Sequence, residues 1–252
     1  MKLVIDAKKL GYRELNLKVR RFLNNNHNSG SSSRDNTIGS GNSKEVIIKN
    51  VLGQRYISDG LKGSSLINIY GTPGNDLGAF MDGPTIEVFG NGQDGVGNTM
   101  NSGKIVVHGD AGDILGYSMR GGEIYVEKNI GFRGGIHMKS YQEKVPVIVI
   151  GGSAGNFLGE YMAGGIIILL GLYKKEKNIF PFYKNKDIVG SYIGTGMHGG
   201  KIYIRGNVEG YKLGKEVKKV KLDSGDINLL DRYIKNYYDF FNFNKVKISV
   251  GS

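Results

Sequence analysis

A methionine that recurs at a fixed interval constrains the fold more than any other feature of this chain. The sequence contains 7 methionines, and each one after Met1 lies in a short glycine-rich segment such as GAFMDG (78–83) or GYSMRGG (116–122). Their positions are Met81, Met100, Met119, Met138, Met162 and Met197, giving three intervals of 19 residues followed by 24 and 35. A residue type confined to one phase of a repeat indicates a repeating architecture rather than a local site.

A short segment rich in β-branched residues stands at one phase of each repeat. Its period of two predicts strands with inward-facing pairs, namely Ile67/Ile69, Ile86/Val88, Ile105/Val107, Ile124/Val126, Val147/Val149, Ile167/Leu169 and Ile202/Ile204. Two further phases carry an apolar residue (Leu77, Val96, Leu115, Leu158, Ile193) and a turn former (Asn75, Asp94, Asp113, Asn156, Ser191). Asp94 and Asp113 therefore belong to a ladder of turns rather than to a catalytic pair of carboxylates.

The repeat is too short to hold a strand and a crossover helix, but it fits three short strands joined by sharp corners. We therefore predict an all-β solenoid, a parallel β-helix of about seven coils in which each coil packs against its neighbours. We expect right-handed winding, because the period differs from the roughly 18-residue coils built of hexapeptide repeats. The 41 glycines suit the corners, and an unbranched methionine suits the irregular space beside one. The methionine ladder is thus predicted to be core.

The sequence on either side of the coils predicts caps and a linker. Residues 12–23 and 227–241 have amphipathic helical patterns. We expect a strand-and-helix cap over 1–23, a low-complexity linker over 24–44, the β-helix over 45–214 and a helical extension over 215–252, with 172–188 as an insertion in the last coil spacing.

Four outward positions of adjacent coils are all apolar: Ile148, Ile150, Ile168 and Leu170. A soluble protein rarely leaves such a patch bare. We expect the C-terminal helix to cover it through Leu229, Leu230, Ile234, Tyr237 and Phe241. Another subunit is the alternative cover.

The residues that could carry chemistry do not form a recognisable site. The chain has no cysteine, which excludes a thiolate nucleophile, disulfides and cysteine-ligated iron–sulfur clusters. The segment GNGQDG (90–95) matches the dinucleotide-binding pattern, but another strand rather than a helix follows it, so we interpret its glycines as coil corners. His108, His137 and His198 occupy different phases of the repeat and are not expected to cluster. We predict no catalytic residues, no cofactor-binding residues, no metal site and no cofactor.

The formal net charge of +11 is concentrated in basic runs at 173–178 and 215–221. We interpret these runs as solvated loops. An acidic partner protein is the first alternative, and nucleic acid is not expected because no known RNA- or DNA-binding motif accompanies the charge. With no signal peptide or membrane-spanning run, we expect a cytoplasmic protein without a membrane partner, and a homo-oligomer stays open.

The repeats resemble those of a known family. Residues from about 46 to 214 resemble the GXGXG domain, the β-helical C-terminal domain of the glutamate synthase large subunit, which is also similar to the corresponding subunit of formylmethanofuran dehydrogenase. The resemblance is carried by GQRYI (53–57), GTPGNDLGAFMDG (71–83), the run of residues 90–122, GFRGGIHMK (131–139), GNFLGEYMAGG (155–165) and GTGMHGG (194–200). The chain looks most similar to the stand-alone version, in which glutamate synthase is split into amidotransferase, β-helix and FMN-binding polypeptides.

The resemblance implies a non-catalytic subunit of an oxidoreductase complex in glutamate biosynthesis. Such a subunit would bridge the amidotransferase and FMN-binding subunits and line the ammonia path between them. The family offers no catalytic residue to transfer to this chain. Two alternatives remain: a subunit of a formylmethanofuran dehydrogenase-type molybdenum or tungsten enzyme, and a free-standing β-helix that binds carbohydrate or nucleotide.

Overall fold

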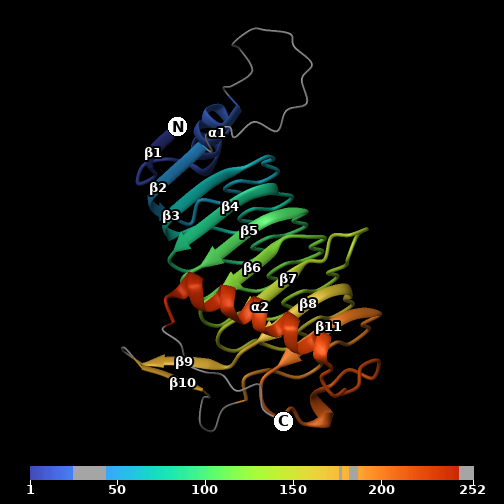
Figure 1. The fold of residues 1–252 in the computed structure, drawn as a ribbon. Helices are drawn as coiled ribbons and strands as arrows, with labels where there is room; N and C mark the ends of the chain where they lie inside the picture. The colour runs from blue at the N-terminus through green and yellow to red at the C-terminus, as the bar shows by residue number, and fades with distance from the viewer. Residues whose placement is uncertain (25–43, 176–177, 182–186, 244–252) are drawn as a thin grey trace.

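The fold is a stack of parallel strands closed by one helix and flanked by another (Figure 1). The computed structural model describes residues 1–24, 44–175, 178–181 and 187–243. The strands form a nine-stranded sheet in the order β1-β2-β3-β4-β5-β6-β7-β8-β11. These strands are β1 (Lys2–Asp6), β2 (Lys44–Leu52), β3 (Ser65–Thr72), β4 (Asp82–Phe89), β5 (Ser102–Val107), β6 (Glu123–Val126), β7 (Val147–Ile150), β8 (Ala163–Leu169) and β11 (Gly199–Ile204).

The remaining elements lie outside this sheet. They are helix α1 (Tyr12–Asn24), helix α2 (Ser224–Phe241), the 3-10 turn η1 (Gly210–Lys212) and an antiparallel hairpin of β9 (Leu172–Lys175) and β10 (Asn178–Pro181). The hairpin falls within the expected insertion at 172–188, and most of the expected linker at 24–44 lies outside the described residues.

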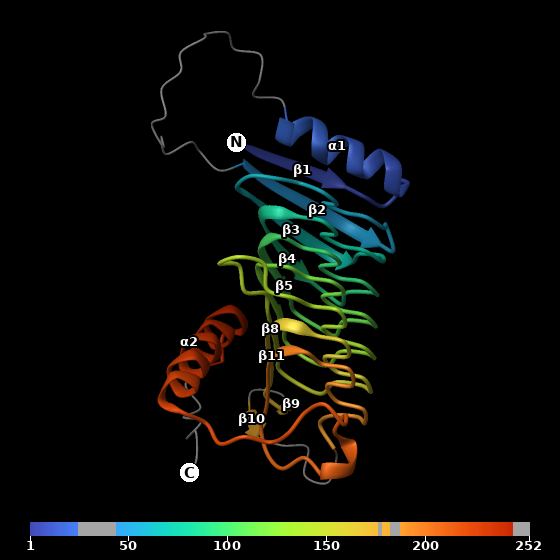
Figure 2. The same cartoon turned by 90° about the vertical axis from the view of Figure 1, so that its right-hand side faces the viewer.

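The predicted parallel β-helix is confirmed. The seven strands expected from the repeat are β3 to β8 and β11, and each pairs in parallel with the next. Seven strands joined in this order enclose about six full turns. Figure 2 shows the turns stacked behind the sheet.

The methionine ladder is core, as predicted. Met81, Met100, Met119, Met138 and Met162 are fully buried, and Met197 in the last coil is partly buried. A glycine of the next coil makes room for the end of each side chain: a Cβ on Gly122, Gly165 or Gly200 would collide with the Cε of Met100, Met138 or Met162. These three glycines also have positive φ angles, so both space and backbone conformation favour glycine there.

The predicted turn ladder is present as a column of hydrogen bonds. The Oδ1 of Asp94 accepts the backbone N–H of Asp113 at 2.9 Å, and the Oδ1 of Asp113 accepts that of Phe132 at 2.8 Å. A second column, which the sequence analysis missed, joins Asn91, Asp110, Asn129 and Ser153. These bonds connect each corner to the one above it and so fix the register of the coils.

The predicted inward pair Val147/Val149 is wrong by one residue. Ile124 pairs with Ile148 and Val126 pairs with Ile150, so the two isoleucines enter the main core while Val147 and Val149 face outward. The run Val147–Ile150 is buried on both faces. Because alternation in such a strand carries no information on phase, the sequence left the register undetermined.

Helix α2 covers the outer face of the sheet, which confirms the predicted cover but changes its members. The covered cluster contains Val106, Tyr125, Val147, Val149, Ile166, Ile168 and Leu170 from the strands, with Leu230, Tyr233, Tyr237 and Phe241 from the helix. Leu229 and Ile234 pack at its margin. Tyr237 lies where Gly151 has no side chain, and its hydroxyl donates a 2.7 Å hydrogen bond to the carbonyl of Glu127.

Helix α1 closes the N-terminal end of the stack (Figure 2). Leu15 and Val19 are 0% and 1% exposed and join the main core. The Nζ of Lys44 donates to the carbonyls of Phe22 and Leu23 at 3.0 and 2.7 Å, at the C-terminal end of the helix where a cation is favoured.

Candidate functional site

A groove of about 800 Å³ opens at the C-terminal end of the solenoid. We call it the terminal groove. Its walls are β11, the segment 213–222 and the first turns of α2, and its lining includes Ile193, Met197, Ile202, Tyr203, Ile204, Leu213, Val217, Leu230 and Ile234. Most of these side chains are apolar, so the last coil presents part of the solenoid core to this groove.

The position of β11 explains why the groove exists. One edge of β11 pairs with β8, for example Ile202 with Ile167 and Ile204 with Leu169. Within the described part of the chain the sheet ends at β11. Ile202 and Ile204 are therefore only partly buried, whereas their counterparts Ile167 and Leu169 are 0% and 1% exposed.

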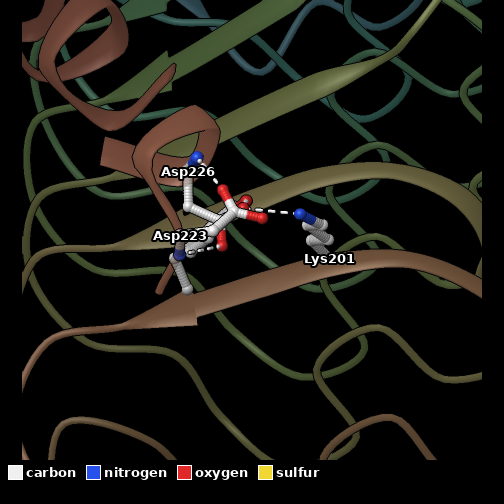
Figure 3. Close-up of polar contacts among 4 residues, drawn as sticks. Lys201, Asp223 and Asp226 are labelled. Carbon is white, nitrogen blue, oxygen red and sulfur yellow. Dashed lines mark hydrogen bonds and ion pairs between the residues drawn. The ribbon is translucent and has the colours of Figure 1, made fainter. Parts of the chain in front are cut away.

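A polar network fixes the start of α2 beside β11 (Figure 3). The Oδ1 of Asp226 accepts hydrogen bonds from the Nζ of Lys201 at 2.5 Å and from the hydroxyl of Tyr203 at 2.7 Å. Asp226 and Asp223 also form a reciprocal capping box, in which each side chain accepts the other residue's backbone N–H. The first turn of α2 is thereby joined to the last strand of the sheet.

The network perturbs the titration of its members. The hydrogen bond from Lys201, followed by those from Tyr203 and the backbone of Asp223, lowers the pKa of Asp226 to about 2. Burial, followed by the hydrogen bond to Asp226, raises the pKa of Tyr203 to about 12. Asp226 is therefore ionised and Tyr203 protonated at neutral pH.

The rim of the terminal groove is basic. Lys215, Lys218, Lys219 and Lys221 are exposed, and the Nζ of Lys219 donates to the Oδ1 of Asn207 at 3.2 Å. Glu216 in the same segment is occupied by the backbone N–H of Gly196 at 3.0 Å, a contact that lowers its pKa. The run 215–221 thus presents positive charge to solvent, as expected. The side chains of the other basic run, 173–178, lie outside the described residues.

The three histidines of the coils lie in different surroundings. His108 contacts the Oε1 of Glu87 through Nε2 at 2.7 Å and stacks on Phe89, with ring centroids 4.9 Å apart. His137 stacks on Tyr161 at 5.3 Å, and His198 lines the terminal groove. Across residues 1–24, 44–175, 178–181 and 187–243, no three histidine, aspartate or glutamate side chains are grouped as a metal site requires.

The glycines of GNGQDG lie at coil corners, as interpreted. Gly90 directly follows β4, and a Cβ there would collide with the carbonyl oxygen of Gly71 in the preceding coil. The next element along the chain is strand β5. No helix N-terminus stands where a bound pyrophosphate would need one among these described residues.

A row of rings and charges on the turn side of the coils was not anticipated. Phe157 stacks on Tyr192 at 4.8 Å, and the guanidinium of Arg133 lies 4.6 Å from the Phe157 ring centroid. Arg133 also pairs with the Oε2 of Glu160 at 3.0 Å. These residues are adjacent only because a coil repeat brings them together. Since their ring faces contact each other, the row strengthens the stacking of coils rather than offering a free platform for a sugar.

The fold and its repeats define a parallel β-helix of the glycine–methionine type, and the comparisons with known proteins agree. The family model described as "GXGXG motif" matches residues 14–249. The chain therefore belongs to the GXGXG motif family.

One relative extends the comparison to nearly the whole chain. An uncharacterized protein of Methanocaldococcus jannaschii is 46% identical over 240 residues, covering 95% of this chain and 84% of the relative. No solved structure matches significantly. Among the described residues, no helix has both the length and the apolar character needed to cross a membrane.

Proposed function

We propose that this chain is a non-catalytic scaffold subunit of a glutamate synthase-type complex in glutamate biosynthesis. In this role it would bridge an amidotransferase subunit and an FMN-binding synthase subunit and line the ammonia path between them. The observation that carries the proposal is the GXGXG match, which extends over most of the chain.

Two properties of the chain support a scaffolding role over a catalytic one. The sequence has no cysteine to act as a glutaminase nucleophile or to ligate an iron–sulfur cluster. The structure is a continuous stack in which hydrogen-bonded corners and buried methionines hold the coils in one register. Such a stack suits the task of holding other subunits at a fixed separation.

The first test is purification of a tagged full-length chain from its native cell at physiological salt. We expect an amidotransferase polypeptide and an FMN-binding synthase polypeptide to co-purify with it. Subunits of a molybdenum or tungsten enzyme would instead support the formylmethanofuran dehydrogenase-type alternative. Recovery of the chain without either set would contradict both.

The second test separates scaffolding from catalysis. Glutamate formation by the two partner polypeptides is measured with glutamine and, separately, with ammonia as the nitrogen donor. We expect addition of this chain to raise the glutamine-dependent rate at least tenfold, and the ammonia-dependent rate much less. The isolated chain should hydrolyse no glutamine. Glutamine hydrolysis by the pure chain, lost on substitution of His108, His137 or His198, would overturn the proposal.

A further inference from the structure

We propose that the terminal groove is a docking site for an acidic β-strand of a partner protein, which adds to the free edge of β11. This inference rests on the proposed scaffolding role and names the surface and the kind of segment that it would hold. It can fail while that role stands, because a scaffold can dock its partners on another face.

The lining of the groove has the pattern that strand addition requires. Side chains of successive residues along β11 belong to opposite faces of the sheet, and both sets contribute to the groove: Ile202 and Ile204 inward, Tyr203 outward. A groove that includes both faces of a terminal strand surrounds its edge. A segment that pairs with this edge would continue the sheet and place alternate side chains on the two faces.

Apolar side chains lie on each side of such a segment. On the inner side it would meet Met197, Leu213 and Val217, and on the outer side Leu230 and Ile234 of α2. The two sides together favour a strand with aliphatic residues at successive positions. The same composition is found in β7 and β8 of this chain, which are buried on both faces.

The charge of the rim selects the flanks of the segment. Lys215, Lys218, Lys219 and Lys221 are exposed along one wall, and the whole chain carries a formal net charge of +11. Opposite charge across an interface raises association rates and discriminates against wrong partners. Glutamate or aspartate residues beside the aliphatic core of the strand therefore fit this rim.

A second copy of this chain fits the groove less well than an acidic partner. Contact between two C-terminal ends would be isologous and would bring two copies of the 215–221 segment together, so that like charges would oppose each other. Contact between a C-terminal and an N-terminal end would meet α1, whose Leu15 and Val19 are already buried.

The test uses the full-length, isotope-labelled chain and three synthetic peptides. The first is EEVIVIVEE, the second replaces each glutamate with lysine, and the third is the acidic peptide with alternate backbone amides N-methylated. Binding is followed by fluorescence anisotropy and by the amide resonances of the protein. We expect the acidic peptide to bind with a Kd on the order of 100 µM or tighter and to shift the amides of Gly199–Ile204 most. The lysine and N-methyl peptides should each bind at least tenfold more weakly.

Matched variants locate the contact. Lys218→Glu with Lys219→Glu should weaken binding of the acidic peptide at least tenfold, whereas Lys128→Glu with Lys139→Glu, also exposed but on other coils, should leave it within twofold. All four lysines are exposed, so neither double variant should unfold. Equal binding of the acidic and lysine peptides, or equal effects of the two double variants, would overturn the proposal.

Two other occupants are outcomes of the same experiment. A chain that ends at Phe243 and binds the acidic peptide at least tenfold more tightly than the full chain would show that the chain's own C-terminus occupies the groove. A full-length dimer whose dissociation releases the groove for the peptide would show that a second copy does so. Either result would overturn the proposal, and a monomer with unchanged affinity after truncation would support it.

Discussion

The two ends of the solenoid are built from the same repeat but finish differently. At the N-terminal end α1 lies over the first coils, and Leu15 and Val19 complete the core there. At the C-terminal end the last strand, β11, leaves Ile202 and Ile204 partly buried beside the terminal groove. A solenoid needs a cap wherever no further coil covers its apolar interior. The difference therefore identifies the C-terminal end as the surface available to another strand.

The largest expected effect compares one methionine in the middle of the stack with the one at its open end. Met119→Asp places a carboxylate in a fully buried position and should cost about 4 kcal/mol or more of unfolding free energy, enough to prevent folding. Met197→Asp makes the same change in a partly buried position and should cost about 1 kcal/mol. Urea unfolding measures both. Equal losses would show that the last coil is as closed as the middle.

The caps themselves can be compared by removing one leucine from each end. Leu15→Ala leaves a cavity under α1 and should cost about 3 kcal/mol. Leu222→Ala removes a side chain that is 44% exposed at the groove and should cost less than about 0.5 kcal/mol. The free energy of unfolding in urea is again the measurement. A cost at Leu222 as large as that at Leu15 would mean that segment 213–222 is a true cap.

The attachment of α2 depends on a missing side chain. Gly151→Ala would place a Cβ against the hydroxyl of Tyr237 and the carbonyl of Glu127, and should destabilise the fold by about 2 kcal/mol while loosening the helix. Gly210→Ala is the control, because a Cβ there meets no atom within 4 Å. The near-ultraviolet signal of the tyrosines and the unfolding free energy report the two effects. A Gly151→Ala protein that retains the parent spectrum and stability would contradict the observed packing of α2.

The smallest expected effect concerns the polar link between α2 and β11. The pKa of Asp226 falls from an ordinary value of 3.8 to about 2 in the folded protein. Its stabilising contribution is therefore complete above about pH 4 and is lost as the pH falls toward 2, because the unfolded chain binds the proton first. Asp226→Asn should flatten the stability profile over this range, as thermal melts at successive pH values would show. An unchanged profile in the variant would mean that the link does not contribute.

Much of the fold could be predicted from the sequence because its key residues recur in one phase. Met81 to Met162 and the pairs from Ile67/Ile69 to Ile124/Val126 are buried as predicted. The same reasoning failed at Val147–Ile150, where both faces are apolar and two consecutive glycines, Gly151 and Gly152, offer two alignments. There the register is decided by contacts to the neighbouring strands and to α2, which periodicity does not contain.

The terminal groove lay beyond the reach of sequence analysis for a different reason. Ile202 and Ile204 have the same pattern as the inward pairs of every other coil, so nothing in their spacing marks them as partly exposed. Their exposure depends on which segment packs next to the last coil. The segment 213–222 has no repeat pattern that would place it over that coil, and only the structure shows that it lies beside the groove.

The most direct test of the asymmetry between the two ends is hydrogen exchange along the native, full-length chain without a partner. The amides of β2 have paired strands on both sides and α1 over the end of the core, whereas β11 has a paired strand on one side. We predict that β2 amides exchange at least tenfold more slowly than β11 amides, with β3 to β7 slower still. Equal protection of β2 and β11 would contradict the account of a solenoid that is closed at one end and open at the other.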